Sequence, residues 1–265
     1  MHATSEQAAT LIWEALRQGT ALAALPADCR PGTREQGYAV QACLAGLAGL
    51  DTVGWKIAAT SLVGQRHIGV AGPLAGRILS GFVHGDGAVV SLEGNRMRVA
   101  EPEFGFFFGR DLPPRPDPYP VAVVLDAVQR VVPVIEAPNS RFADFAHAGE
   151  AQLIADLACA GHFLVGGETG ARWRELDFPD HPVRGLVTHG GATVAQRDGT
   201  GAAVLGDPRV ALAWLVNELS SLGITLRAGQ FASTGTCMPP LEVQAGDTAL
   251  ADFGALGQVS VRFCR

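Results

Sequence analysis

Two carboxylates are separated by one proline in Glu101-Pro102-Glu103, and the apolar run 104–108 follows them directly. Because alternate residues of a strand share a face, Glu101 and Glu103 are expected to project side by side. Neighbouring carboxylates repel unless one is protonated or a cation lies between them, and hard oxygen ligands suit Mg²⁺ or Mn²⁺. Two solvated charges at a strand end have the same spacing, so the pair alone leaves both interpretations open.

A third carboxylate, Glu136, follows the apolar run 131–135, where plain solvation is difficult. It could complete a metal site of three carboxylates, or it could be an exposed residue that ends a strand. Arg141 follows shortly afterwards and could hold a substrate carboxylate through two parallel hydrogen bonds. A structural ion pair is the alternative for this arginine.

The chain holds 20 Lys plus Arg residues, and Lys56 is the single lysine among them. It lies in the otherwise apolar stretch 54–60. Lysine can lose its proton when desolvated, and its charge is concentrated on one nitrogen. Arginine stays protonated, and its charge is spread over the guanidinium. Lys56 is therefore a candidate for proton transfer, and the ordinary alternative is a surface lysine whose stem covers apolar residues.

Four predicted helices help to position these side chains. Capping-box spacing indicates helix starts at Thr4 and Thr33. Asp207 and Pro208 indicate another start, and Gly223 the end of that helix. The ranges expected to be helical are 4–25, 33–50, 150–164 and 207–223.

Segments rich in Val and Phe and bounded by turn residues predict strands. A hairpin turn is expected at Asp198-Gly199. Helix and strand do not alternate regularly, so the expected class is α+β with a mixed or antiparallel sheet. We expect a mainly helical N-terminal subdomain over 1–85 and a β-rich catalytic domain over 86–265. The expected strand regions are 88–92, 102–108, 121–134 and 241–263.

Composition excludes several classes of function. The net charge of −6 without a basic run argues against nucleic acid and anionic membranes as partners. No signal peptide or membrane-length apolar run is visible, and five cysteines without CxxC spacing favour reduced thiols and a cytoplasmic location. Cys237 could be nucleophilic, with a buried small residue as the alternative. Dinucleotide, P-loop, zincin and α/β-hydrolase motifs are missing from the sequence.

Five ordered blocks together resemble one family over nearly the whole chain. They are GWKIAATS at 54–61, EPEFGFFFGRDL at 101–112, VIEAPNSRF at 134–142, GDPRVALAWLVNEL at 206–219 and the stretch from Leu226 to Phe263. They are similar to the 2-keto-4-pentenoate hydratase and 4-oxalocrotonate decarboxylase branch of the fumarylacetoacetate hydrolase superfamily.

The resemblance implies a mixed β fold with a helical N-terminal part, a homo-oligomer and a small 2-oxo or 2-hydroxydienoic acid as substrate. It implies a cytoplasmic enzyme of aromatic catabolism that uses Mg²⁺ or Mn²⁺. Glu101, Glu103 and Glu136 are then metal ligands and Lys56 is catalytic. The residues implied to bind substrate are Thr60, Ser140, Arg141, Thr234 and Gly235.

Two positions differ from the family pattern. Leu74-Ala75-Gly76 stands where hydratases commonly carry an acidic residue, and Asn139 stands where they commonly carry aspartate. The expected reaction is hydration of a 2-hydroxy-2,4-dienoate to a 4-hydroxy-2-oxo acid. The alternatives are decarboxylation of a 4-oxalocrotonate-like diacid, an acylpyruvate-type hydrolase or tautomerase, and a non-catalytic partner subunit.

Overall fold

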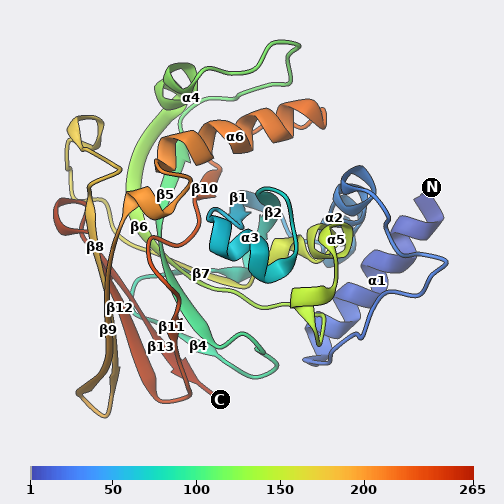
Figure 1. The fold of residues 1–265 in the computed structure, drawn as a ribbon, viewed down its shortest axis with the longest axis horizontal. Helices are drawn as coiled ribbons and strands as arrows, with labels where there is room; N and C mark the ends of the chain where they lie inside the picture. Colours follow the sequence, from blue (N-terminus) through green and yellow to red (C-terminus); the bar gives the residue numbers. More distant parts are fainter. Residues whose placement is uncertain (1) are drawn as a thin grey trace.

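The computed structural model describes residues 2–265, which form two β-sheets flanked by α-helices (Figure 1). The α-helices are α1 (His2–Gln18), α2 (Arg34–Ala48), α3 (Leu62–Ile68), α4 (Val121–Ala127), α5 (Glu150–Ala155) and α6 (Pro208–Ser221). The first strands are β1 (Thr52–Ala58), β2 (Leu74–Leu79), β3 (Val83–Gly85), β4 (Ala88–Ser91), β5 (Val99–Phe108), β6 (Val128–Ala137) and β7 (His162–Val165). The remaining strands are β8 (Pro182–His189), β9 (Ala192–Thr200), β10 (Phe231–Ser233), β11 (Leu241–Glu242), β12 (Asp247–Asp252) and β13 (Gln258–Cys264).

The larger sheet has the order β2-β1-β10-β5-β6-β7-β3, and β11 also pairs with β5. The smaller sheet has the order β4-β13-β12-β8-β9. Both sheets contain parallel and antiparallel pairs, as the pairings β1 with β10 and β5 with β6 show in the larger one. The expected mixed-sheet α+β class is confirmed.

The larger sheet is covered on both faces. One hydrophobic cluster joins Ile12 of α1 and Leu44 of α2 to Val132 and Val134 of β6. On the opposite face, Phe104 makes edge-to-face ring contacts with Phe178 and Phe253. The strands that carry the candidate site therefore lie in the middle of the molecule, where side chains are held by packing from both sides.

Two of the helix starts follow the sequence signals. Thr33 accepts a hydrogen bond from Gln36 N as N-cap of α2, and Asp207 accepts one from Arg209 N as N-cap of α6. Thr4 is not an N-cap, because α1 already includes His2, and this helix ends at Gln18 rather than near 25. The predicted helix 150–164 is also wrong beyond Ala155, where a left-handed turn leads into β7.

Two strand predictions also need correction. The range 121–134 is divided, since Val121–Ala127 forms α4 and β6 begins only at Val128. The hairpin turn lies at Gly190-Gly191, where both φ angles are positive (56° and 87°), and not at Asp198-Gly199. Asp198 is instead inside β9, opposite Arg184 of β8, with which it forms an ion pair.

The larger sheet crosses the subdomain boundary expected at residues 85 and 86. β1 lies between β2 and β10, so a strand from the N-terminal range is paired with one near the C-terminus. The helical description suits the part up to Ala48, which holds α1 and α2. Within the described residues, no helix is both long enough and apolar enough to cross a membrane.

Candidate metal centre and active site

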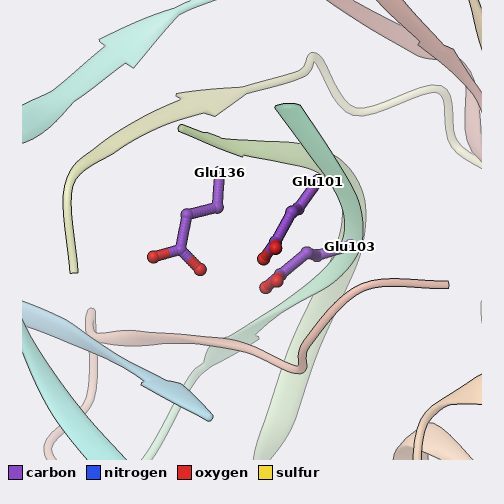
Figure 2. Close-up of side chains that lie close together, drawn as sticks. All are labelled: Glu101, Glu103 and Glu136. Carbon is purple, nitrogen blue, oxygen red and sulfur yellow. The ribbon is translucent and has the colours of Figure 1, made fainter. Parts of the chain in front are cut away.

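The three glutamates predicted from the sequence lie together on one face of β5 and β6. Glu101 is directly opposite Glu136 in the antiparallel register, and Glu103 is opposite Val134. Each offers a carboxylate oxygen, and these oxygens lie within 4.8 Å of one another. Figure 2 shows the three carboxylates directed into the same space from the two neighbouring strands.

The end of β10 and the residues after it supply partners for one of these carboxylates. Glu103 Oε2 accepts hydrogen bonds from Ser233 Oγ at 2.5 Å and from Gly235 N at 3.0 Å. This fixes one oxygen and leaves the other free for a different partner. Gly235 has a positive φ of 95°, and an added Cβ would lie 2.3 Å from Thr60 Oγ1, so the close approach requires glycine.

The remaining oxygens of the cluster fit a cation. Glu103 Oε1 and Glu136 Oε1 are buried without a hydrogen-bond partner among the described residues. Burial and then the charge of Glu103 raise the pKa of Glu101 to about 7, although Lys56 lowers it. Burial also raises the pKa of Glu136 well above its ordinary value. Three converging carboxylates, two of which have unpartnered buried oxygens, are a donor set that suits a hard divalent metal.

Lys56 lies beside this cluster and is almost fully buried. Its Nζ is 3.2 Å from Glu136 Oε2 and donates a hydrogen bond of 3.0 Å to the backbone oxygen of Ala158. Burial lowers the pKa of Lys56, but the charges of Glu136, Glu101 and Glu103 outweigh that effect and raise it overall. Lys56 is therefore an ammonium group held next to the carboxylates, and it is not a surface lysine.

The carbonyl that receives this hydrogen bond belongs to a left-handed turn. Leu157, Ala158 and Cys159 have φ angles of 54°, 50° and 62°, a conformation that is unfavourable for residues other than glycine. The turn passes close over β2, since a Cβ added at Gly76 would lie 2.0 Å from Leu157 O and 3.1 Å from Lys56 Cγ. Gly76 therefore makes room for both the turn and the lysine.

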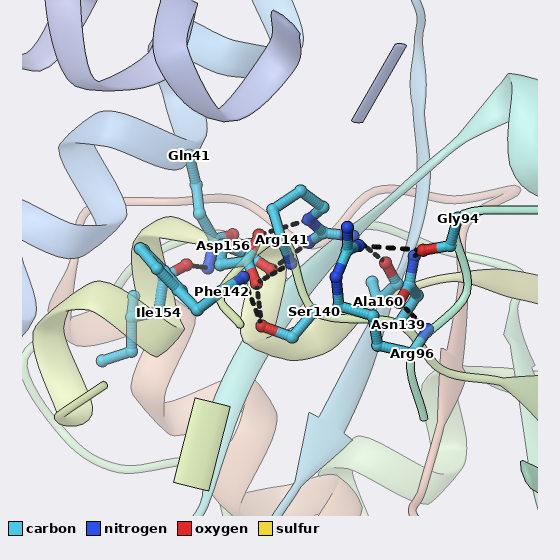
Figure 3. A network of polar contacts seen from close by, with 10 residues as sticks. All are labelled: Gln41, Gly94, Arg96, Asn139, Ser140, Arg141, Phe142, Ile154, Asp156 and Ala160. Atoms are coloured by element: carbon cyan, nitrogen blue, oxygen red, sulfur yellow. Dashed lines mark hydrogen bonds and ion pairs between the residues drawn. The ribbon is translucent and has the colours of Figure 1, made fainter. Parts of the chain in front are cut away.

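Ser140 and Arg141 hold the residue that starts this turn. Asp156 Oδ2 accepts hydrogen bonds from Ser140 Oγ at 2.7 Å and from Arg141 N at 2.9 Å. The Arg141 guanidinium donates to Asp156 Oδ1, to Asp156 O and to Ala160 O, as Figure 3 shows. Each guanidinium nitrogen is thus engaged within the protein, so Arg141 forms the structural ion pair that the sequence left open.

Known proteins resemble this chain in sequence and in fold. No family model matches the chain. The chain is 32% identical over 261 residues to a 2-keto-4-pentenoate hydratase of Paraburkholderia xenovorans, and the alignment covers 97% of this chain and 94% of that protein. The chain belongs to the 2-keto-4-pentenoate hydratase family.

Other proteins similar to this chain are a second hydratase and a decarboxylase. A 2-hydroxyhexa-2,4-dienoate hydratase of Comamonas testosteroni is 30% identical, with 95% of this chain and 94% of that protein covered. A solved structure of 4-oxalocrotonate decarboxylase from Pseudomonas putida G7, complexed with magnesium and adipate, superposes with a TM-score of 0.86 at 27% identity. That superposition covers 99% of this chain and 98% of the decarboxylase.

The two departures from the family pattern have different surroundings in this hydratase family member. Leu74 is fully buried and pairs with Ala58 at the start of β2. Asn139 donates from Nδ2 to Gly94 O and accepts at Oδ1 from Arg96 N, so it ties the 94–96 loop to the end of β6 (Figure 3). An ionised aspartate could not donate the first of these bonds, which is a structural reason for asparagine here.

The other residues predicted to contact substrate are Thr60, Thr234 and Gly235. Gly235 contacts Glu103 through its backbone N–H, and Thr60 lies against Gly235. The buried Thr234 Oγ1 has no hydrogen-bond partner among the described residues. The thiol of Cys237 is fully buried, and burial followed by the charge of Glu103 raises its pKa well above the ordinary value. Cys237 therefore stays protonated and is a poor nucleophile.

Sequence reasoning missed Ser233, Asp156 and the turn 157–159. Ser233 had a local signal, because it directly precedes Thr234-Gly235. Asp156 and the turn had none, since their roles arise from contacts with Arg141 and Lys56 that are distant in sequence.

Proposed function

We propose that this chain is a metal-dependent hydratase that adds water to a 2-hydroxy-2,4-dienoate and yields a 4-hydroxy-2-oxo acid. The observation that carries the proposal is the group of three converging carboxylates, with unpartnered oxygens on Glu103 and Glu136, beside the single lysine, which is buried. The names of the relatives support the same reaction.

Glu101, Glu103 and Glu136 would hold the divalent metal, for which we propose Mg²⁺ or Mn²⁺. When bound, such a metal supplies a Lewis acid that stabilises negative charge developing on a 2-oxo acid. The hydrogen bonds from Ser233 and Gly235 fix the orientation of Glu103 for this role.

Lys56 would act on the proton that moves during the reaction. Its ammonium group can donate a proton to the dienol carbon chain or stabilise an oxyanion next to it. Thr60, Thr234 and Gly235 remain the proposed substrate contacts. Ser140 and Arg141 were expected in that role, and we propose instead that they position the turn that holds Lys56.

A decarboxylase is the second candidate. Enolate formation from a 4-oxalocrotonate-like diacid needs the metal and the lysine, but it does not need an acid to activate water. Leu74 places a buried apolar side chain where family hydratases commonly have an acid, and Asn139 is engaged with the 94–96 loop. These two observations favour plain enolate chemistry, which includes tautomerisation. Hydrolysis of a 1,3-dicarbonyl would also fit the metal site, but it requires water as a reactant.

The test is an ultraviolet assay of the purified protein with 2-hydroxypenta-2,4-dienoate or a 2-oxo diacid, in Mg²⁺, Mn²⁺ or EDTA. We expect metal-dependent loss of the dienol absorbance and a 4-hydroxy-2-oxo acid identified by NMR. Carbon dioxide release from the diacid without hydration would assign the decarboxylase instead. Ketonisation alone, or no turnover, would exclude the hydratase.

A variant tests the metal ligands and the non-catalytic alternative. Mn²⁺ titrated into E101A should bind at least tenfold more weakly than to the wild type. E242A is the matched control, because Glu242 is an exposed carboxylate on β11, which pairs with the beginning of β5. Equal binding to wild type and E101A would remove the ligand assignment.

We further propose a cytoplasmic homo-oligomer that acts in the catabolism of aromatic compounds. Five free cysteines in the described structure support a reducing compartment. Leu62 and Val63 at the start of α3 are each 70% exposed, which supports an interface with another copy of the chain. Sedimentation analysis of the wild type and of a L62S/V63S variant tests the assembly.

A further inference from the structure

Arg77 on β2 has no acidic partner within the described residues. It is partly buried, its Nε has no hydrogen-bond partner there, and its Nη1 contacts Thr52 Oγ1 only at a long 3.5 Å. Burial alone lowers its pKa to about 10. Because a charge withdrawn from water is ordinarily paired, Arg77 is a candidate anchor for an anion.

Trp55 on β1 orients this guanidinium. It is the register partner of Arg77 on the neighbouring strand, and the Arg77 Cζ lies 4.6 Å from the centre of the Trp55 ring. The indole Nε1 is a second buried donor without a partner among the described residues. A guanidinium placed over an aromatic ring can still present two parallel N–H groups to a carboxylate.

Both side chains line a cavity of about 660 Å³. Residues of the loop 223–230 also line it, and this loop is anchored to β1 because Gln230 Nε2 donates a hydrogen bond of 2.8 Å to Thr52 O. The charged residues that line it are Asp51, Arg77 and Arg227, so the cavity has a net positive charge. Its apolar lining residues are Val53, Trp55, Ile224 and Ala228.

This cavity lies on the opposite face of the sheet from the metal-ligand cluster. Lys56 is opposite Gly76 on β2 and Ser233 on β10, whereas Trp55 is opposite Arg77 and Ala232. Because side chains alternate between faces along a strand, Lys56 and Ser233 share the face of the glutamates. Trp55 and Arg77 lie on the other face, so Trp55 does not shape the space around Glu136.

We propose that this cavity is a second site, which binds a carboxylate-bearing molecule with Arg77 as its anchor. A short organic carboxylate fits the positive charge of this cavity beside its aromatic wall. Two sources could supply the carboxylate that Arg77 binds. One is a free small organic acid, and the other is an acidic side chain of a second copy of the chain.

Thermal unfolding and sedimentation of wild type, R77M and R77K separate these sources. Malonate is the probe, with chloride at matched ionic strength as the blank. For a free acid, saturating malonate should raise the Tm of the wild type by about 3 °C or more, and this shift should vanish in R77M and shrink in R77K. For a second copy, R77M should instead sediment as a smaller species than the wild type.

R197M is the control, because Arg197 is an exposed arginine on β9 of the other sheet.

Methionine at position 77 removes an unpaired charge from a partly buried position, so R77M is expected to fold. R77K keeps the charge and provides a second test should R77M fail. Metal titration of R77M should match that of the wild type, because the two sites lie on opposite faces. The proposal is overturned if malonate shifts the wild type and R77M equally or not at all, while both also sediment alike.

Discussion

Lys56 keeps its charge in a buried position because three carboxylates surround it. We expect K56Q to lower turnover by about 10²–10⁴-fold, the usual contribution of a positioned acid or base. Glutamine is uncharged and keeps an N–H donor in this buried position, so the fold should persist. The measurement is kcat for the dienol in Mn²⁺, beside a Mn²⁺ titration that should show binding retained.

R98Q is the control for this prediction, because Arg98 lies outside the cluster and its side chain donates to Asn95 O. It should leave kcat within about twofold of the wild type. If K56Q had the kcat of the wild type, Lys56 would be a structural residue and the proton would need a different donor.

Glu101 makes the metal-free protein sensitive to pH. Its folded pKa of about 7 exceeds the ordinary value of 4.5, so the folded chain binds more protons than the unfolded chain between these values. Stability is therefore lost as pH rises from about 4.5 to 7, by about 1–3 kcal/mol. E101Q should remove the share of this loss that Glu101 contributes and leave that of Glu136, whose pKa is also raised. Urea unfolding in EDTA at pH 5 and pH 8 would measure the difference.

Added Mn²⁺ should narrow the difference between the two pH values in the wild type, since the metal stabilises the ionised cluster. It should have little effect on the unfolding of E101Q. Identical pH slopes for wild type and E101Q would contradict the assignment of this sensitivity to Glu101.

At the scale of elements, Asn139 connects the end of β6 to the 94–96 loop. N139D should cost about 1–2 kcal/mol of stability, because the aspartate cannot donate to Gly94 O. We also expect no gain in hydration, since the side chain is directed to the loop. Urea unfolding and the dienol assay measure the two effects.

The matched control is N217D, because Asn217 likewise accepts from one backbone N–H and donates to a carbonyl, both of Tyr119. It should lose a similar amount of stability and keep its activity. A rise in hydration in N139D alone would show that residue 139 reaches the substrate.

The sequence was informative where a local pattern decides the structure. The i, i+2 spacing of Glu101 and Glu103 on an apolar strand needs no distant contact to bring them together. In contrast, Val121–Ala127 has the composition of a strand but forms α4, which packs against α6. Leu157–Cys159 contains no glycine or asparagine that would indicate positive φ. Contacts made elsewhere in the fold decide both segments, and such contacts override local preference.

At the scale of the whole molecule, the two sheets share one core. A single hydrophobic cluster includes Tyr38 of α2, Trp55 of β1 and Phe263 of β13. We therefore expect residues 1–85 and 86–265, expressed separately, not to fold, because β1 would lose β10 and the cluster would be divided. Calorimetry of the full chain in EDTA should show one transition. Dispersed NMR spectra from either fragment would show independent domains instead.

The hydrogen bond from Lys56 to Ala158 affects how the results of mutagenesis should be interpreted. Its acceptor is a main-chain oxygen, and the residue that carries it is already alanine. Alanine scanning would therefore report position 158 as wild type and miss a contact of Lys56, the proposed catalytic residue. The sensitivity would appear instead at Asp156, Arg141 and Gly76, which hold or accommodate the turn. A mutational map of this protein would thus show loss of activity at residues that support the turn, and not at the residue whose carbonyl contacts Lys56.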